Sequence, residues 1–378
     1  TLMRRLSFDL TGLPPSSSEV EAFVAAHSLD PDAAIAAEVD RLLNSPQFGE
    51  RFGRHWLDVA RYGESSGKEV NATFPHAWRY RDYVIDSFNA DKPFDQFVTE
   101  QIAGDLLPAD SDSKKAEQIV ATSFLAIGTK GLNEQNARQF RFDLVDEQID
   151  TTTQAFLATT AACARCHDHK FDPIPMSDYY AMAGIFLSSE TLFGTAESLQ
   201  NRKSTELISL PAGSNSGGEV KSLGEMIDLE FQKVTLQEQL DTLTAAARAA
   251  RQEGNGDRAT QIQLQSIGVR NRLGITSQIL ESYDDEGYPK PLAMGMRDLP
   301  SPFDSQILIR GEEDNPTEER APRGFVQVVK TNDEKPIPRA RLTISDSVVD
   351  LLVAVCFLLT QLSGKKELGP ITTKYPPE

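Results

Sequence analysis

The chain has 378 residues, a formal net charge of −18 and a hydrophobic content of 39%. This length allows about two or three domains, and the composition is that of a soluble globular protein. The acidic balance argues against general nucleic-acid binding, which requires a basic face. Three cysteines are too few for a fold held together mainly by disulfide bonds.

The predicted fold class is mainly α, and residues 1–195 are expected to form one helical, cytochrome-like domain. Ser16 and Glu19 have the spacing of a capping box, which predicts a helix that begins after Ser16. Pro31 and Pro46 each follow a residue that favours a helix start, and proline is preferred in the first turn of a helix. Further helices are expected over 77–88, 93–106, 119–127 and 142–160, with a polar surface loop at 109–116 and a short helix capped by Ser177.

A change of composition follows this domain. Residues 196–218 contain a glycine- and serine-rich run that is typical of a linker. Residues 219–283 hold almost no aromatic side chains and are interrupted near 253–257. This profile predicts an antiparallel, coiled-coil-like helical hairpin.

The C-terminal part, 284–378, is predicted to be a small β-rich region with extended loops. Short β-branched runs at 306–310 and 325–329 are typical of strands. The apolar run 351–360 is too short to span a membrane and is expected to be buried, together with Cys356. No transmembrane span is therefore expected in this chain.

The most specific pattern is Cys163-Ala-Arg-Cys-His167, the spacing of a c-type haem attachment sequence. Two thiols one helical turn apart can reach the two haem vinyl groups, and the adjacent imidazole can bind the iron. The pattern predicts thioether bonds at Cys163 and Cys166 and an axial bond from His167. The expected role is electron transfer to or from a redox partner protein. Because such haem is attached outside the cytoplasm, the expected location is extracytoplasmic, with a signal peptide outside this chain.

The second axial position needs a ligand from elsewhere in the chain. His169 is separated from His167 by one residue, and so short a tether cannot reach the opposite side of the haem plane. His55 is the leading candidate, followed by Met176, His76 and Met182. A second histidine would lower the iron potential and a methionine would raise it. The alternative for His55 is a structural histidine bonded to a carboxylate.

The same cluster has a zinc interpretation. Cys163, Cys166, His167 and His169 could form a tetrahedral set, with Asp168 or Asp172 as an additional ligand. Four ligands within seven residues would be cramped, because common zinc sites take two ligands from a distant segment. A third interpretation is a carbohydrate-active hydrolase that uses His55, Asp58 and Glu64, and it rests on scattered carboxylates alone.

Five arginines in the N-terminal region could pair with haem propionates: Arg51, Arg54, Arg61, Arg79 and Arg81. The preferred alternative is ion pairing with carboxylates at helical spacing, namely Asp58, Glu64, Asp82 and Asp86. Trp56 and Trp78 are expected to pack in the core rather than to relay electrons.

Several blocks recur in the order of a known family. They are residues 4–15, 49–62, 77–83, 89–97, 101–108 and 163–174, followed by Asp178-Tyr-Tyr180. In these blocks the chain resembles the planctomycete cytochrome c-associated proteins that are built from paired domains of unknown function. The resemblance implies haem c binding, an extracytoplasmic location and association with polysaccharide degradation, without a defined reaction. Residues 308–316 resemble the start of the second domain, whereas 331–378 depart from it, so this domain is expected to be incomplete here.

Overall fold

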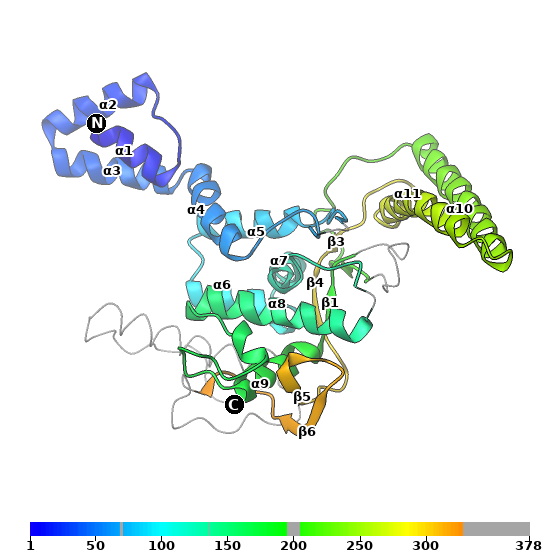
Figure 1. Ribbon diagram of the computed structural model, residues 1–378. Coiled ribbons are helices and arrows are strands. Elements are labelled where there is room, and N and C mark those ends of the chain that lie inside the picture. Colours follow the sequence, from blue (N-terminus) through cyan, green and yellow to red (C-terminus); the bar gives the residue numbers. More distant parts are fainter. Residues whose placement is uncertain (69–70, 135, 195–204, 328–378) are drawn as a thin grey trace. The chain divides into compact units, whose positions relative to one another are not determined.

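The computed structural model describes residues 1–68, 71–134, 136–194 and 205–327 (Figure 1). These residues form two compact units. The first comprises Thr1–Leu144 and Glu190–Arg297, and the second comprises Val145–Ser189 and the described residues from Asp298 onward. The fold is mainly α with a small β part, as predicted. None of the described helices is both long enough and apolar enough to cross a membrane.

The chain begins with three helices, α1 (Leu2–Leu10), α2 (Ser17–Leu29) and α3 (Pro31–Leu43). They enclose a small core of Met3, Phe23 and Ala34. The predicted capping box is confirmed: the backbone N–H of Glu19 donates to the Ser16 hydroxyl, and the Glu19 carboxylate accepts from the backbone N–H of Ser16. These local bonds satisfy N–H groups that would otherwise lack a partner.

Helices α4 (Pro46–Val59) and α5 (Trp78–Asn89) pack closely because glycines face the contact. A Cβ added at Gly49 would lie 2.4 Å from the Ile85 carbonyl oxygen, so no larger residue fits there. The Gly49 N–H donates to the Asn89 side chain at 2.8 Å. Trp56 donates from its indole nitrogen to Tyr80 at 2.9 Å, consistent with a packing role.

The next helices differ in part from the prediction. α6 (Phe94–Ala103) is confirmed, but α7 (Asp112–Ala121) occupies much of the segment predicted as a loop at 109–116. The helix starts early because the Ser111 hydroxyl accepts from the backbone N–H of Lys114 at 3.2 Å, an N-cap that the sequence analysis missed. The predicted helix 119–127 is instead the end of α7 followed by the 3-10 helix η2 (Thr122–Leu125), and α8 spans Ala137–Leu157.

A buried ion cluster lies between α6 and α7. The Glu100 side chain is fully buried and accepts from Lys92 and Lys114, each at 2.6 Å. Its remaining contacts include the Tyr83 hydroxyl at 3.0 Å. A buried carboxylate is tolerated only with such partners, so this cluster fixes how the two helices meet.

The predicted hairpin is confirmed as α10 (Leu223–Gln252) and α11 (Gly256–Glu281), which lie side by side and antiparallel (Figure 1). A second capping box, between Ser222 and Glu225, opens α10. The seam between the helices is made by Leu236, Val269 and Leu273.

The β part of the described chain consists of three two-stranded sheets. β1 (Ser189–Leu192) pairs with β4 (Gly295–Asp298), β2 (Ile208–Ser209) with β3 (Leu292–Ala293), and β5 (Ser305–Leu308) with β6 (Pro316–Ala321). β5 confirms the strand predicted near 306–310, and the 3-10 helix η4 (Ile309–Gly311) follows it.

The strand predicted over 325–329 is wrong for the residues of it that the structure describes. Residues 325–327 are not part of a strand, and 328–329 lie outside the described residues. The backbone N–H of Gln327 instead donates to the Asp178 carboxylate at 2.9 Å. The apolar run 351–360, with Cys356, also lies outside the described residues.

Candidate functional site

Cys163 lies in the 3-10 helix η3 (Ala162–Arg165), and Cys166 is the C-cap residue that follows it. The backbone N–H of Cys166 donates to the Cys163 carbonyl at 3.3 Å. Because a 3-10 helix has about three residues per turn, side chains three positions apart are eclipsed. Both thiols are free and exposed. The turn therefore presents two accessible thiols on the same side of the backbone.

His167 follows this turn and is exposed. Its Nδ1 atom lies 2.8 Å from the Asp168 carbonyl oxygen, which can only accept a hydrogen bond. In the tautomer that satisfies this contact, Nδ1 carries the proton and Nε2 keeps its lone pair. An imidazole held in this way is suited to binding a metal through Nε2, since histidine ligands commonly donate their other N–H to a carbonyl.

Asp168 joins the motif to the next helix, α9 (Met176–Leu187). Its carboxylate accepts from the backbone N–H of Met176, the first residue of α9, at 2.9 Å. The prediction that Ser177 caps this helix is wrong, since Ser177 is its second residue. The acceptor comes from Asp168 because the intervening loop folds back, and a carboxylate is favoured at a helix N-terminus.

His169 holds this loop in shape. Its side chain is only 7% exposed, and Nδ1 accepts from the backbone N–H of Asp172 at 2.9 Å. Its own backbone N–H donates to the Ile174 carbonyl at 2.9 Å. One ring nitrogen of His169 is thus already used in the loop. Within the described ranges, no group of three or more His, Cys, Asp or Glu side chains is arranged to hold a metal ion.

The turn of the motif is anchored from α9 and from the end of β5. The Tyr180 hydroxyl lies 2.7 Å from the Arg165 carbonyl, to which it donates, and 3.5 Å from the Leu308 carbonyl. Burial raises the pKa of this phenol to about 12, so it stays a hydrogen-bond donor at neutral pH. Arg165 in turn donates from Nε to the Gly311 carbonyl at 3.3 Å.

Gly311 lies directly against the thiol of Cys166. A Cβ added at this position would meet Cys166 Sγ at 2.8 Å and Arg165 Cγ at 3.0 Å, and the residue has a positive φ of 71°. Sequence reasoning missed this contact. The glycine was visible within the block 308–316, but no local signal links it to a cysteine more than one hundred residues earlier.

The candidates for a second axial ligand lie in both units. Met176 and Met182 are on α9, in the same unit as the motif, and Met182 is buried. His55 and His76 belong to the first unit. His55 is exposed on α4 with its ring edge-on to Phe52, at 6.2 Å between centroids. His76 is buried, with Nε2 at 3.4 Å from the Ser282 hydroxyl, and burial lowers its pKa to about 4. Their use as ligands stays a prediction.

The arginines of the first unit have varied partners. Arg81 pairs with Glu64 at 3.1 Å and with Asp82 at 3.0 Å, so the predicted ion pairing is confirmed for this residue. Arg79 instead donates to two backbone carbonyls, those of Asn215 and Ser216, at 2.5 and 2.7 Å. It therefore binds the chain segment that precedes α10.

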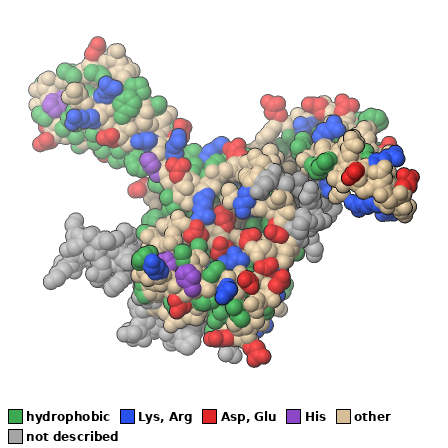
Figure 2. Space-filling model, in the orientation of Figure 1, with side chains coloured by type: hydrophobic (Ala, Val, Ile, Leu, Met, Phe, Trp, Pro, Cys, Tyr) green, Lys and Arg blue, Asp and Glu red, His purple; other side chains and the backbone are tan. Residues whose placement is uncertain are grey.

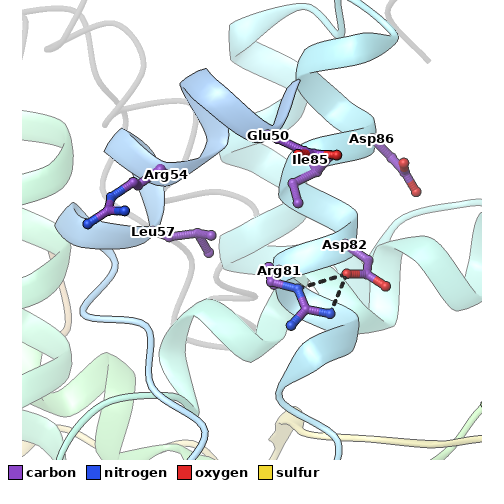
Figure 3. A pocket seen from close by; sticks show the side chains of 7 residues that line it. All are labelled: Glu50, Arg54, Leu57, Arg81, Asp82, Ile85 and Asp86. Atoms are coloured by element: carbon purple, nitrogen blue, oxygen red, sulfur yellow. Dashed lines mark hydrogen bonds and ion pairs between the residues drawn. The ribbon is translucent and has the colours of Figure 1, made fainter. Parts of the chain in front are cut away.

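A polar pocket of about 610 Å³ lies between α4 and α5 (Figure 3). Arg54 and Arg81 line it together with the carboxylates of Glu50, Asp82 and Asp86. The pKa of Asp86 is raised mainly by burial and to a smaller extent by the nearby negative charges of Asp82 and Glu117. Of the residues considered for a hydrolase, His55 and Asp58 are exposed on α4, and the Glu64 carboxylate is engaged with Arg81 and with the Tyr62 hydroxyl.

Comparison with known proteins gives a family for the N-terminal half. The family named PSCyt2, described as "Protein of unknown function (DUF1549)", matches residues 1–191. This range includes Cys163, Cys166 and His167 and ends within β1, before the hairpin. No curated protein and no solved structure gives a match to the chain. Since the family covers just over half of the 378 residues, the chain belongs to the DUF1549 family of proteins of unknown function.

Proposed function

We propose that this protein binds one c-type haem through Cys163, Cys166 and His167 and serves in electron transfer. The observation that carries the proposal is the arrangement of these three residues in and directly after one short 3-10 turn. Both thiols are free and exposed, and the next imidazole is held by a backbone carbonyl at Nδ1. This donor set fits the attachment of a porphyrin with two vinyl groups and one axial bond to iron.

The chain's residues have defined tasks in this proposal. Cys163 and Cys166 would each hold the haem through a thioether bond formed by addition of the thiol across a vinyl group, with the thiol hydrogen placed on the neighbouring carbon, so no oxidant would be consumed. The Asp168 carbonyl keeps the proton of His167 on Nδ1, which leaves Nε2 for the iron and increases its basicity. The bound group would supply reversible one-electron transfer.

For the second axial position we propose Met176 ahead of His55. Met176 lies in the same unit as the motif, whereas His55 lies in the other unit. A methionine at this position would raise the potential relative to a histidine pair. The measurement is the visible spectrum of Met176→Ala and His55→Ala, and an unchanged spectrum for Met176→Ala would exclude Met176.

The proposed cellular setting follows from the haem and from the resemblance. Attachment of haem c takes place outside the cytoplasm, so an extracytoplasmic location is proposed. The resemblance described above suggests a partner oxidoreductase that acts in polysaccharide degradation.

The test is expression of the full chain with and without a cytochrome c maturation system. We expect a haem-stained band on a denaturing gel and a cytochrome-like spectrum only with maturation. The matched control is the double variant Cys163→Ala/Cys166→Ala, which removes both thiols from an exposed turn and should be colourless. A colourless wild-type protein that retains zinc on metal analysis would refute the haem proposal and favour the zinc interpretation.

A further inference from the structure

A groove between α10 and α11 is lined by three arginines and contains no carboxylate. It has a volume of about 240 Å³, with Arg248, Arg251 and Arg270 at its sides and Leu243 and Ala247 among its lining. We call it the arginine groove. It belongs to the hairpin, which lies at the right of Figure 2, where Lys and Arg side chains are blue. The positive charge of the groove contrasts with that of the chain as a whole, which carries a net charge of −18.

The arginines of the groove lack the acidic partners that a nearby arginine has. Arg258, on the same hairpin, pairs with Glu253 at 3.8 Å. Arg251 donates to the Gln263 side chain at 2.7 Å, which holds its guanidinium across the two helices but leaves its charge uncompensated. Among the described residues, neither Arg248 nor Arg270 forms an ion pair. Three positive groups around one groove repel one another, and a bound anion would relieve this repulsion.

The hydrogen-bonding groups of the groove select for an acceptor. The Thr244 hydroxyl donates to the Leu240 carbonyl at 2.8 Å, and the Ser266 hydroxyl donates to the Gln263 carbonyl at 2.7 Å. Both hydroxyl hydrogens are therefore used inside their own helices. The donors that remain are the side-chain N–H groups of Gln263 and the guanidinium N–H groups, whose planar fork matches two oxygens of a phosphate, sulfate or carboxylate group.

The size of the groove sets a limit on the ligand. A volume of about 240 Å³ lies below the ~300–1,000 Å³ of pockets for drug-sized ligands. One or two tetrahedral oxyanion groups fit such a space. We propose that the arginine groove binds a compact, multiply charged oxyanion of the phosphate or sulfate type through Arg248, Arg251 and Arg270. This site is independent of the proposed haem.

The test is calorimetric titration of the full chain with inorganic pyrophosphate at low ionic strength, where exposed charges are least screened. We expect saturable binding with one site per chain. Arg251→Gln and Arg270→Gln should each weaken it about tenfold. The matched control is Arg258→Gln, which removes the same charge from the same hairpin outside the groove and should leave the affinity unchanged. Helix content by circular dichroism checks that each variant is folded.

Two results would overturn the proposal. One is the absence of saturable heat with pyrophosphate, and the other is an equal loss of affinity in Arg258→Gln, which would indicate non-specific attraction to surface charge. A parallel titration with glucose 6-sulfate, compared with glucose, distinguishes the source of the anion. Binding of the ester supports recognition of a charged group on a larger molecule, and binding of pyrophosphate alone supports a free anion.

Discussion

Replacing Gly311 with alanine is expected to impair attachment of haem at Cys166 while Cys163 still reacts. The added Cβ would lie 2.8 Å from Cys166 Sγ, whereas ordinary contact begins near 3.4 Å, so the sulfur must move by about 0.6 Å. Alanine at a φ of +71° also costs ~1–2 kcal/mol in backbone strain. Because Cys166 is exposed, its thiol can rotate away. The crowding should therefore change the attachment chemistry more than the stability.

The assay compares wild type, Gly311→Ala and Cys166→Ala after expression with cytochrome c maturation. The α-band position of the pyridine haemochrome and the masses of haem peptides report how many thioether bonds have formed. We expect Gly311→Ala to contain a fraction with one thioether, as in Cys166→Ala. The matched control is Gly213→Ala: Gly213 has a φ of +82°, but an added Cβ meets no atom within 4 Å.

This control separates backbone strain from crowding. Gly213→Ala should lose similar stability to Gly311→Ala and keep both thioether bonds. Equal formation of both bonds in the two variants would refute the positioning role of Gly311. A wild-type protein without haem would instead refute the proposed function, so the two failures are distinguishable.

Three further predictions concern the stability of the first unit. Glu100→Ala would remove the buried carboxylate that accepts from Lys92 and Lys114, which both keep Glu117 as a partner, and should lower the free energy of unfolding by ~1.5–3 kcal/mol, measured by urea denaturation; a loss below that of an exposed ion-pair variant such as Glu190→Ala would contradict this. Burial lowers the pKa of His76 from 6.5 to about 4, so the unfolded chain binds a proton there that the folded protein does not. The free energy of unfolding, measured by urea denaturation, should then fall by up to about 3 kcal/mol as the pH drops from 6.5 to 4. His76→Gln should flatten this pH dependence, and an unchanged pH dependence in the variant would contradict the role of His76. Ser222→Ala removes the N-cap of α10 and should cost ~1 kcal/mol, seen as a lower midpoint of thermal unfolding; an unchanged midpoint would show that the hairpin does not limit the transition.

Local signals were sufficient for several helix boundaries. The capping box at Ser16 involves residues three positions apart, and the hairpin follows from a stretch almost without aromatic side chains that is interrupted near 253–257. Such signals act within one or two turns, so they can be read without knowing the fold. The same logic failed at Ser111, where the cap precedes a polar stretch that resembles a loop. It also failed at α9, whose N-terminal acceptor, Asp168, lies eight residues before Met176.

For the attachment motif, too, some features were determined by the sequence and others only by the tertiary structure. The sequence by itself determined that two thiols and an imidazole are adjacent, because Cys163, Cys166 and His167 lie within five consecutive residues. Only the tertiary structure decided that the turn is 3-10, that Tyr180 holds it, and that Gly311 lies against one sulfur. It likewise decided that arginines of α10 and α11 share one groove. Contacts between distant segments depend on how elements pack, and a single sequence carries no local signal for that packing.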